Sequence, residues 1–382
     1  MALRRKLTLP LLHASFALTG ILHAIGGALL PALALSLGLS DNRSGALFFC
    51  YYLGTAIGAL ASVGRYVPRM AGGFAVAAAI CCAIAWGEPA LLPGLFLALG
   101  VGVGLPMTTV SMYAGRIFAG NTAAPLALLN FTWSAGALMA PLAATRILAS
   151  HSWRAVYALL ALLSGLAAVA CWIWLPEPPA EAETQVRTEP TVSFAARYSV
   201  VTLFAVLTFL EVGIENTTAT WLASYAMRAA GTGVAMAAAF SSLYWGGFLI
   251  SRGLSSVLLL RLKPARMLWA MAALALIASL ALVSFASAAH AAMVVLGLAL
   301  APIFPLLLSC FFDRTARVSD SRWVLAICGF GGSVLPWVTG VISSSVGSLR
   351  IGLYVVPVAL ASFLALLPFI GARRKRGELP NG

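Results

Sequence analysis

The sequence consists of long apolar runs that are separated by short polar breaks. A run of roughly 20 mostly apolar residues is long enough to cross the hydrocarbon core of a bilayer as a helix. Inside that core every backbone N–H and C=O must find its partner within the segment, so an α-helix is expected for each run. The pattern predicts twelve spans, near residues 11–36, 44–64, 70–87, 91–115, 123–148, 154–175, 198–226, 235–260, 266–287, 290–311, 323–346 and 351–370.

The composition excludes a soluble fold. Hydrophobic residues make up 61% of the chain and charged residues 9%, whereas soluble domains carry roughly 25% charged residues. Twelve spans and their connections use up the 382 residues, so no room remains for a soluble domain. The predicted fold class is an all-α membrane protein, and we expect the first span to be retained, because its apolar stretch continues past Pro31 without a cleavage site.

One polar segment divides the chain. Residues 176–197 are rich in proline and acidic residues and are too polar to enter a membrane. Six predicted spans lie before this segment and six after it. We therefore expect an N-terminal six-helix bundle over 1–175, a linker over 176–197 and a C-terminal six-helix bundle over 198–382.

The positive charges lie at the ends of the predicted spans and favour one side of the membrane. The chain carries 24 Lys and Arg residues and a net charge of +13. With both termini inside, 19 of these residues, including Arg252 of the basic segment 251–264, fall on one side and 5 on the other. Positive residues concentrate in cytoplasmic loops, so we expect a bacterial inner-membrane protein with both termini and the linker in the cytoplasm. The lipid bilayer, and not a nucleic acid, is the predicted partner of these charges.

Two acidic residues stand apart from the other nine of the chain's eleven. Glu211 and Glu215 alone lie inside a predicted span, four residues apart, on a helical face that continues through Thr218 to Tyr225. A charged group at membrane depth costs at least a few kcal/mol and faces protein or water. The two acids are therefore candidates for binding a solute or carrying a proton, and the alternative is a contact between helices.

Further candidates are amides, aromatic residues and one histidine. Buried amides can both donate and accept hydrogen bonds, which suits the recognition of hydroxyl groups. Aromatic rings offer flat faces to a sugar ring or an apolar ligand, and a histidine can relay protons. The alternative for each is a packing or interfacial role. These candidates are the amides Asn130 and Asn216, the aromatic residues Tyr52, Trp133, Trp221, Tyr225 and Trp245, and His23.

Nothing in the sequence indicates catalysis. The six cysteines lie in apolar runs without the spacing of a metal site or a disulfide framework. The four histidines are dispersed, and no nucleophile, histidine and acid cluster is apparent. We expect no enzymatic activity, no cofactor and no metal.

Several local motifs resemble those of the major facilitator superfamily. HSWRAVY at 151–157 resembles the Trp-Arg-x-x-Tyr signature that opens the sixth span there, and SRGLSSVLLLRLKP at 251–264 resembles the basic loop between spans eight and nine. GRYVPR at 64–69 keeps the arginines of the loop after span two but lacks its usual aspartate. The resemblance implies two six-helix halves that surround a binding site near the middle of the membrane.

Within that superfamily, the chain is most similar to the fucose permease-like sugar:proton symporters. The similarity is carried by segments 48–59, 129–142, 211–226 and 304–309. Members of this family place a functional aspartate in span one and a functional glutamate in span four, and those positions are Gly27 and Met107 here. The resemblance also implies the pattern aromatic-Val-Gly-x-acid or amide in span seven. Glu215 supplies its acid, whereas Glu211 stands where the pattern has an aromatic residue.

These observations together predict a secondary active transporter. We expect it to move a small polar organic solute, a sugar or sugar derivative, by alternating access with proton coupling. Efflux of amphipathic compounds is one alternative, favoured by the aromatic interior and by the missing acids in spans one and four. A membrane receptor that moves no solute is the other.

Overall fold

The computed structural model describes residues 2–118, 123–178, 194–258, 263–312 and 318–371. The described chain is helical throughout and contains no strand. Two short 3-10 turns, Pro89–Leu91 and Ala286–Ala288, precede α4 and α10. The helices are α1 Ala2–Leu37, α2 Asp41–Leu60, α3 Tyr66–Trp86, α4 Leu92–Ile117, α5 Ala123–Leu148, α6 Trp153–Trp174, α7 Phe194–Ala230, α8 Val234–Leu258, α9 Pro264–Ser284, α10 Ala289–Leu300, α11 Ile303–Phe312, α12 Val318–Val346, α13 Leu349–Gly352, α14 Val355–Leu366 and α15 Pro368–Gly371.

These helices follow the twelve predicted spans. Two spans are broken: α10 and α11 form one, interrupted at Pro302, and α13 to α15 form the last. Proline lacks the N–H that a continuous helix would use, which accounts for the first break. Within the described residues, 11 helical segments are long and apolar enough to cross a membrane. The twelfth, α2, is less apolar because it begins with the polar turn 41–44.

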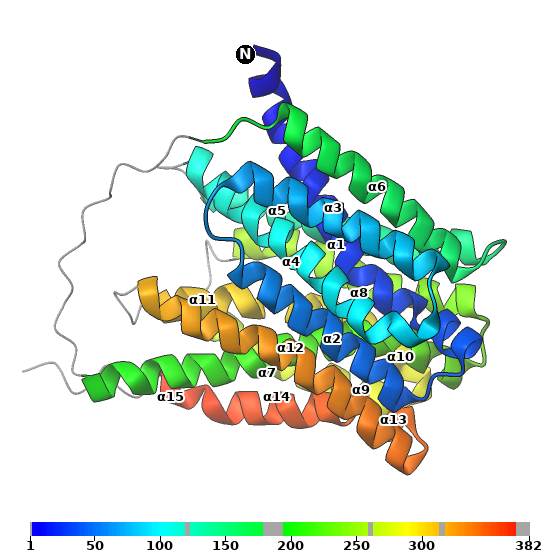
Figure 1. Ribbon diagram of the computed structural model, residues 1–382. Coiled ribbons are helices and arrows are strands. Elements are labelled where there is room, and N and C mark those ends of the chain that lie inside the picture. The colour runs from blue at the N-terminus through cyan, green and yellow to red at the C-terminus, as the bar shows by residue number, and fades with distance from the viewer. Residues whose placement is uncertain (1, 119–122, 179–193, 259–262, 313–317, 372–382) are drawn as a thin grey trace, which may run out of the picture.

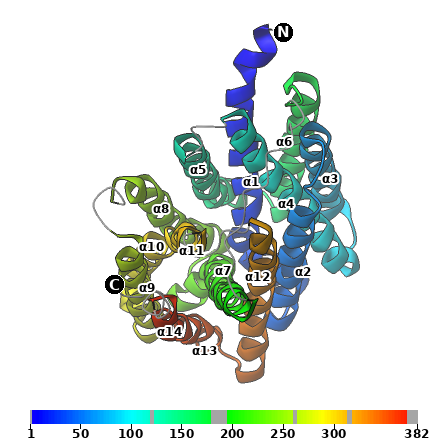
Figure 2. The ribbon, with the colours of Figure 1, turned by 90° about the vertical axis from the view of Figure 1, so that its left-hand side faces the viewer.

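The helices form two bundles, as predicted. Figure 2 views the molecule along its helices and shows α1–α6 on one side and α7–α14 on the other. The bundles meet where α1 packs on α7, α2 on α12 and α5 on α8. Helix α7 begins at Phe194, four residues inside the predicted linker, and residues 179–193 of that linker lie outside the described part. We call the end of the molecule where α6 ends and α7 begins the linker end and the opposite end the far end (Figure 1).

At the linker end, the carboxylate of a residue far away in the sequence caps the N-terminus of α3. Glu177 accepts hydrogen bonds from the backbone N–H groups of Tyr66 and Val67, at 2.6 and 3.0 Å. A negative charge is favourable at a helix N-terminus, where the N–H groups have no partner in the helix. Glu177 therefore supplies, from the linker, a carboxylate at the loop where the sequence motif lacks its aspartate.

At the far end, the two bundles are joined by polar contacts that we call the far-end latch. Arg228, at the end of α7, donates from Nη1 to Asp41 at the start of α2 over 2.7 Å and forms an ion pair with it through Nη2. Ser343 of α12 also donates to Asp41, and the backbone N–H of Asn42 donates to Ser344 over 2.7 Å. The latch closes the far end between α2, α7 and α12.

Candidate functional site

Helix α7 presents its two glutamates toward the interface between the bundles. Glu211 is 1% exposed, and neither of its carboxylate oxygens has a hydrogen-bond partner among the residues that the structure describes. Glu215, one turn further along, is partly accessible. Helical spacing places both side chains on one face, as predicted, and α7 packs against α1, α8 and α12. The two carboxylates therefore lie inside protein and not in lipid.

Arg252 of α8 reaches the same region. Its guanidinium lies over the ring of Phe248 at 4.9 Å and that of Trp133 at 5.6 Å, and it donates to Oδ1 of Asn130 over 2.9 Å. Among the described residues it is the positive charge that acts on both glutamates. No hydrogen bond or ion pair joins it to either of them within the described ranges.

Aromatic residues from both bundles surround these charges. His23 of α1 lies 5.3 Å from Trp133 of α5 and 5.6 Å from Tyr52 of α2, measured between ring centroids. Trp133 also contacts the second bundle, because its ring lies 5.8 Å from that of Trp245 of α8. The ring of Tyr244 lies 5.0 Å from that of Trp245. Centroid separations of this size are typical of packed aromatic pairs. We call these five residues, with Glu211, Glu215 and Arg252, the central cluster.

Several buried polar atoms of the central cluster form no hydrogen bond within the described part of the chain. Buried polar groups are nearly always hydrogen-bonded, because leaving one unpaired costs about 1–3 kcal/mol. A concentration of such groups at one place indicates that something polar completes them. The buried atoms without a partner there are Oε1 and Oε2 of Glu211, Nε of Arg252, Nε1 of Trp133, the hydroxyl of Tyr244 and Nδ1 of His23.

A cavity leads to the cluster from the linker end. It has a volume of about 320 Å³ and is bounded by α5, α8, the start of α9 and α11. Asn130, Arg252, Ser255 and Ser309 are its polar lining residues, and Phe304 and Pro302 close its apolar side. Ligand pockets typically measure roughly 300–1,000 Å³, so the cavity is large enough for a small solute, and its lining includes the guanidinium of the cluster.

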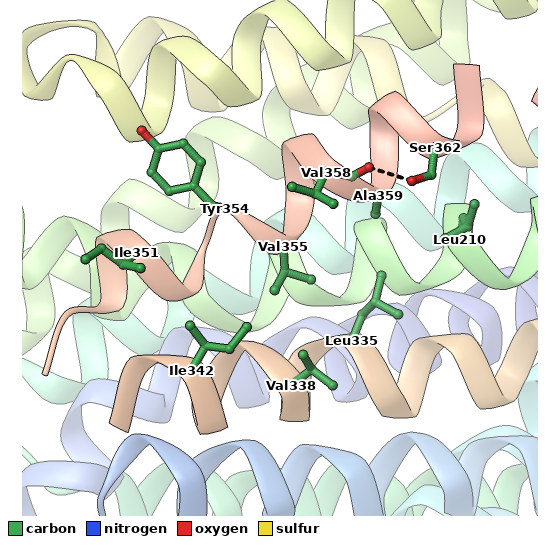
Figure 3. Close-up of a pocket in the computed structure, with 10 residues that line it drawn as sticks. All are labelled: Leu210, Leu335, Val338, Ile342, Ile351, Tyr354, Val355, Val358, Ala359 and Ser362. Atoms are coloured by element: carbon green, nitrogen blue, oxygen red, sulfur yellow. Dashed lines mark hydrogen bonds between the residues drawn. The ribbon is translucent and has the colours of Figure 1, made fainter. Parts of the chain in front are cut away.

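A larger hollow lies elsewhere and differs in chemistry. The groove shown in Figure 3 measures about 530 Å³ and runs between α7, α12 and the α13–α14 segment. Its lining is aliphatic apart from Tyr354 and Ser362, and the hydroxyl of Ser362 already donates to the backbone oxygen of Val358 over 2.9 Å. An apolar, open groove of this kind suits lipid chains and offers nothing to orient a polar solute.

The structure brings most of the predicted residues together but not all. Asn216 is buried beside the cluster, within hydrogen-bonding reach of His23. Asn130 was predicted to be buried and is exposed, because it lies at the cavity where α5 meets Arg252. Tyr225 lies away from the cluster, where its hydroxyl donates to the backbone oxygen of Leu282 over 2.7 Å. Trp221 donates to Pro336 and is wholly buried in the packing of α7 on α12.

Sequence reasoning missed two members of the cluster. Arg252 was assigned to the cytoplasmic side as a topology signal, but it lies inside α8, six residues before the helix ends at Leu258. Without it the charge asymmetry is 18 against 5, so the predicted orientation does not depend on it. Tyr244 has no charge and no motif to draw attention to it. Arg252 could have been found from its position inside the predicted span 235–260, because a charged residue at membrane depth is a candidate for a functional site.

The structure also explains a departure from the symporter pattern. A Cβ at Gly27 would collide with the carbonyl oxygen of Ala219, because α1 and α7 approach each other closely there. An aspartate is therefore incompatible with this packing. Beside this contact, the hydroxyl of Tyr52 lies 3.1 Å from Oγ1 of Thr220. The position that bears an acid in the related symporters is a close contact between bundles in this chain.

Comparisons with known proteins agree with this architecture. The sequence profile of the Major Facilitator Superfamily matches residues 12–321. The chain is similar to FucP, a superfamily transporter solved in its outward conformation, with 18% identity, a TM-score of 0.64, and coverage of 95% of this chain and 98% of that one. It is also similar to a D-xylose–proton symporter, with 14% identity, a TM-score of 0.72 and coverage of 94% and 96%.

A third similar structure is an inward-facing, unoccupied bacterial homolog of the human lysosomal transporter Spinster, with 15% identity, a TM-score of 0.69 and coverage of 97% and 96%. Comparison with curated proteins found no match. At these identities the solved structures show a shared fold and no more.

Twelve helical spans in two bundles, with a polar cluster enclosed where the bundles meet, define a multi-pass membrane transporter. Since the profile covers most of the sequence, the chain belongs to the major facilitator superfamily. The predicted fold class is confirmed. Within the described residues no group of three or more His, Cys, Asp or Glu is placed to hold a metal ion.

Proposed function

We propose that this protein is a secondary active transporter that moves a small polar organic solute, a sugar or sugar derivative, through the central cluster by alternating access. The observation that carries the proposal is the set of buried polar atoms without partners, contributed by both bundles. A solute with hydroxyl groups would accept from the indole N–H of Trp133 and from Nε of Arg252, and would donate to Glu211. Its binding would bridge the two halves.

We propose further that the transport is coupled to protons through Glu215 and Glu211. The two carboxylates are the acidic groups at membrane depth, and they lie one helical turn apart. A proton that binds to either carboxylate neutralises its charge. Solved sugar–proton symporters with this fold support a coupled mechanism by analogy. Gly27 and Met107 cannot take part, because neither side chain titrates.

The orientation in the membrane is a proposal as well. The asymmetry of positive charges favours a cytoplasmic linker end and an extracellular far end. A cysteine introduced at Thr184, within the linker and outside the described residues, tests this in intact cells. We expect labelling by an impermeant thiol reagent only after the inner face is exposed, whereas labelling from outside would reverse the topology.

Flux in proteoliposomes tests the main proposal and its alternatives. Purified protein is reconstituted, and uptake of labelled sugars and amphipathic compounds is followed with and without an imposed pH gradient. Gradient-driven accumulation of a sugar supports the proposal. Gradient-driven extrusion of amphipathic compounds would support efflux instead, and binding without flux would support a receptor.

Two substitutions test whether the cluster is the binding site. Asn130→Ala removes the acceptor that holds Arg252, and Trp133→Ala removes the ring that contacts the second bundle together with an indole N–H that is free to bind a solute. We expect both to weaken solute binding in a folded protein. Unchanged affinity in both variants would return these residues to a packing role.

A further inference from the structure

The charges of the central cluster do not balance. Glu211 and Glu215 together carry two negative charges when ionised, and Arg252 supplies one positive charge. Other ionisable groups around them are His23 on α1, Tyr52 on α2, Tyr244 on α8 and Cys328 on α12. None of these four is a permanent cation. Counting only the side chains that the structure describes, the cluster therefore keeps one negative charge without a counter-charge.

A buried carboxylate without a counter-charge is costly, and one bound positive charge removes that cost. The bound charge can be a proton or a cationic group of the solute, but both together would leave the cluster with an excess of positive charge. The two therefore compete, so a proton leaves the cluster as the amine binds, and an acidic vesicle interior is the gradient that would drive accumulation of the solute. Resting on the proposed function, we infer that the solute carries a single protonated amine, which binds at Glu211 and Glu215 in competition with one proton.

The surroundings specify which kind of cation fits. The side chains of Tyr52 and Tyr244 lie close enough to Glu215 to interact with its charge. Trp245 packs against Tyr244, and Trp133 packs against Trp245. Aromatic faces attract organic ammonium groups. Phe248 and Trp133 already hold the guanidinium of Arg252 in this way. A bare metal ion would require more oxygen ligands than the two carboxylates provide. The site therefore suits an organic amine.

The unpartnered donors specify the rest of the solute. Nε1 of Trp133, Nε of Arg252 and the Tyr244 hydroxyl are buried and free to donate, so the solute must present acceptor atoms beside its amine. Hydroxyl oxygens meet this requirement. The chemical class is thus a small polyhydroxylated amine, of which an amino sugar is the simplest example.

A thermal-shift and calorimetric comparison of matched compounds tests the inference. The probes are D-glucosamine, D-glucose and N-acetyl-D-glucosamine, which share a ring and differ in the charge at one position. We expect glucosamine to raise the melting temperature and to bind at least about tenfold more tightly than the two neutral compounds, a difference of about 1.4 kcal/mol. Equal or tighter binding of a neutral compound would overturn the inference.

Competition with the proton needs a probe whose own charge does not titrate. Choline keeps its positive charge at every pH, so any change in its affinity reports on the protein. If one proton is displaced, choline affinity should fall as the pH falls, by up to about tenfold for each pH unit in the range where the protonated cluster dominates. A pH-independent affinity, or no binding of either amine, would overturn the inference.

Variants separate charge from fold. Glu215→Gln should lower the affinity for glucosamine and flatten the pH dependence of choline binding, whereas Glu215→Asp should keep both because it keeps the charge. Size-exclusion profiles show whether each variant is folded. If Glu215→Gln does not fold, the same binding measurements are made on Glu211→Gln. Neutral sugars that are bound and transported while amines are not would defeat this inference and leave the proposed function intact.

Discussion

The far-end latch and the central cluster are built from the same kinds of groups but use them differently. In the latch, Asp41 receives hydrogen bonds from Arg228 and from Ser343, so its carboxylate is fully engaged. In the central cluster, Glu211 accepts no hydrogen bond from any described residue, and Arg252 leaves its Nε free. Both regions join the same two bundles. One acid is paired within the protein, and the other remains available.

The difference in pairing separates the far-end latch, which holds the bundles together, from the binding site that we propose. Burial raises the pKa of Asp41, but the hydrogen bonds from Arg228 and Ser343 and the charge of Arg228 outweigh it and hold that pKa below its ordinary value. A paired group of this kind stabilises one conformation. An unpaired buried group destabilises the empty protein and is stabilised by a ligand. The contrast predicts different outcomes when each region is changed.

The largest effect is expected from Glu215→Gln. If one proton is coupled to each solute, a gradient of one pH unit supplies about 1.4 kcal/mol, which supports a tenfold solute gradient. The glutamine keeps the shape of the side chain but cannot carry the proton. Gradient-driven accumulation should fall to the external concentration, while exchange of solute partly survives. Glu211→Gln should be milder, and wild-type accumulation by Glu215→Gln at every pH would make the proton-carrier assignment wrong.

The next largest effect is expected from Gly27→Ala, which breaks the contact between the bundles that lies between the two regions. The added methyl group collides with the backbone at Ala219, and overpacking of this kind typically costs about 1–3 kcal/mol. We expect a lower melting temperature and easier opening of the far end, measured by labelling of a cysteine placed at Asn42. Gly72→Ala is the control, because nothing lies within 4 Å of a Cβ there.

Asp41→Asn should have a smaller effect, confined to the latch. Arg228 is 43% exposed, so the pair contributes only about 1 kcal/mol. The depressed pKa of Asp41 means that this stabilisation is present above about pH 4 and is lost as the pH falls through the folded-state pKa. The melting temperature of the variant should be lower than wild type at pH 7 and should converge with it at strongly acidic pH. Solute affinity should not change.

The smallest effect on stability is expected from Trp133→Phe. The substitution keeps an aromatic ring but leaves a small cavity at a buried position, which costs stability. It also removes a buried indole N–H that has no hydrogen-bond partner among the described residues, which offsets that cost, so the free energy of unfolding should change by less than about 0.5 kcal/mol. Solute binding should weaken several-fold, because the solute loses a donor worth roughly 0.5–1.5 kcal/mol. A clear loss of stability without loss of affinity would show that Trp133 belongs with the latch as a structural residue.

Much of the fold could be predicted from the sequence, because the membrane imposes local rules. The predicted span 123–148 has the same bounds as α5, and the predicted span 154–175 differs from α6 by one residue at each end. The pair Glu211 and Glu215 was found because acids at membrane depth are rare and helical spacing alone puts them on one face. Each of these inferences needs only residues that are close together in the chain.

The rest depended on contacts between distant segments. Sequence proximity to a basic loop suggested that Arg252 was a topology signal, and the structure places it against Asn130, 122 residues earlier in the chain. Tyr225 shares the helical face of the glutamates in sequence, but it lies near the end of α7, where its hydroxyl donates to the backbone oxygen of Leu282. The latch joins residues 187 positions apart.

The sequence alone therefore determined the number of spans, their division into halves, the family resemblance and the two acids, because a helix in lipid satisfies its backbone within itself. Only the tertiary structure decided which polar groups are paired and which are free. Pairing depends on the rotation and depth at which two helices meet, and these are set by close contacts such as that of Gly27 with Ala219. That is why Asp41 is paired in the far-end latch, whereas Glu211 is left free in the site that we propose.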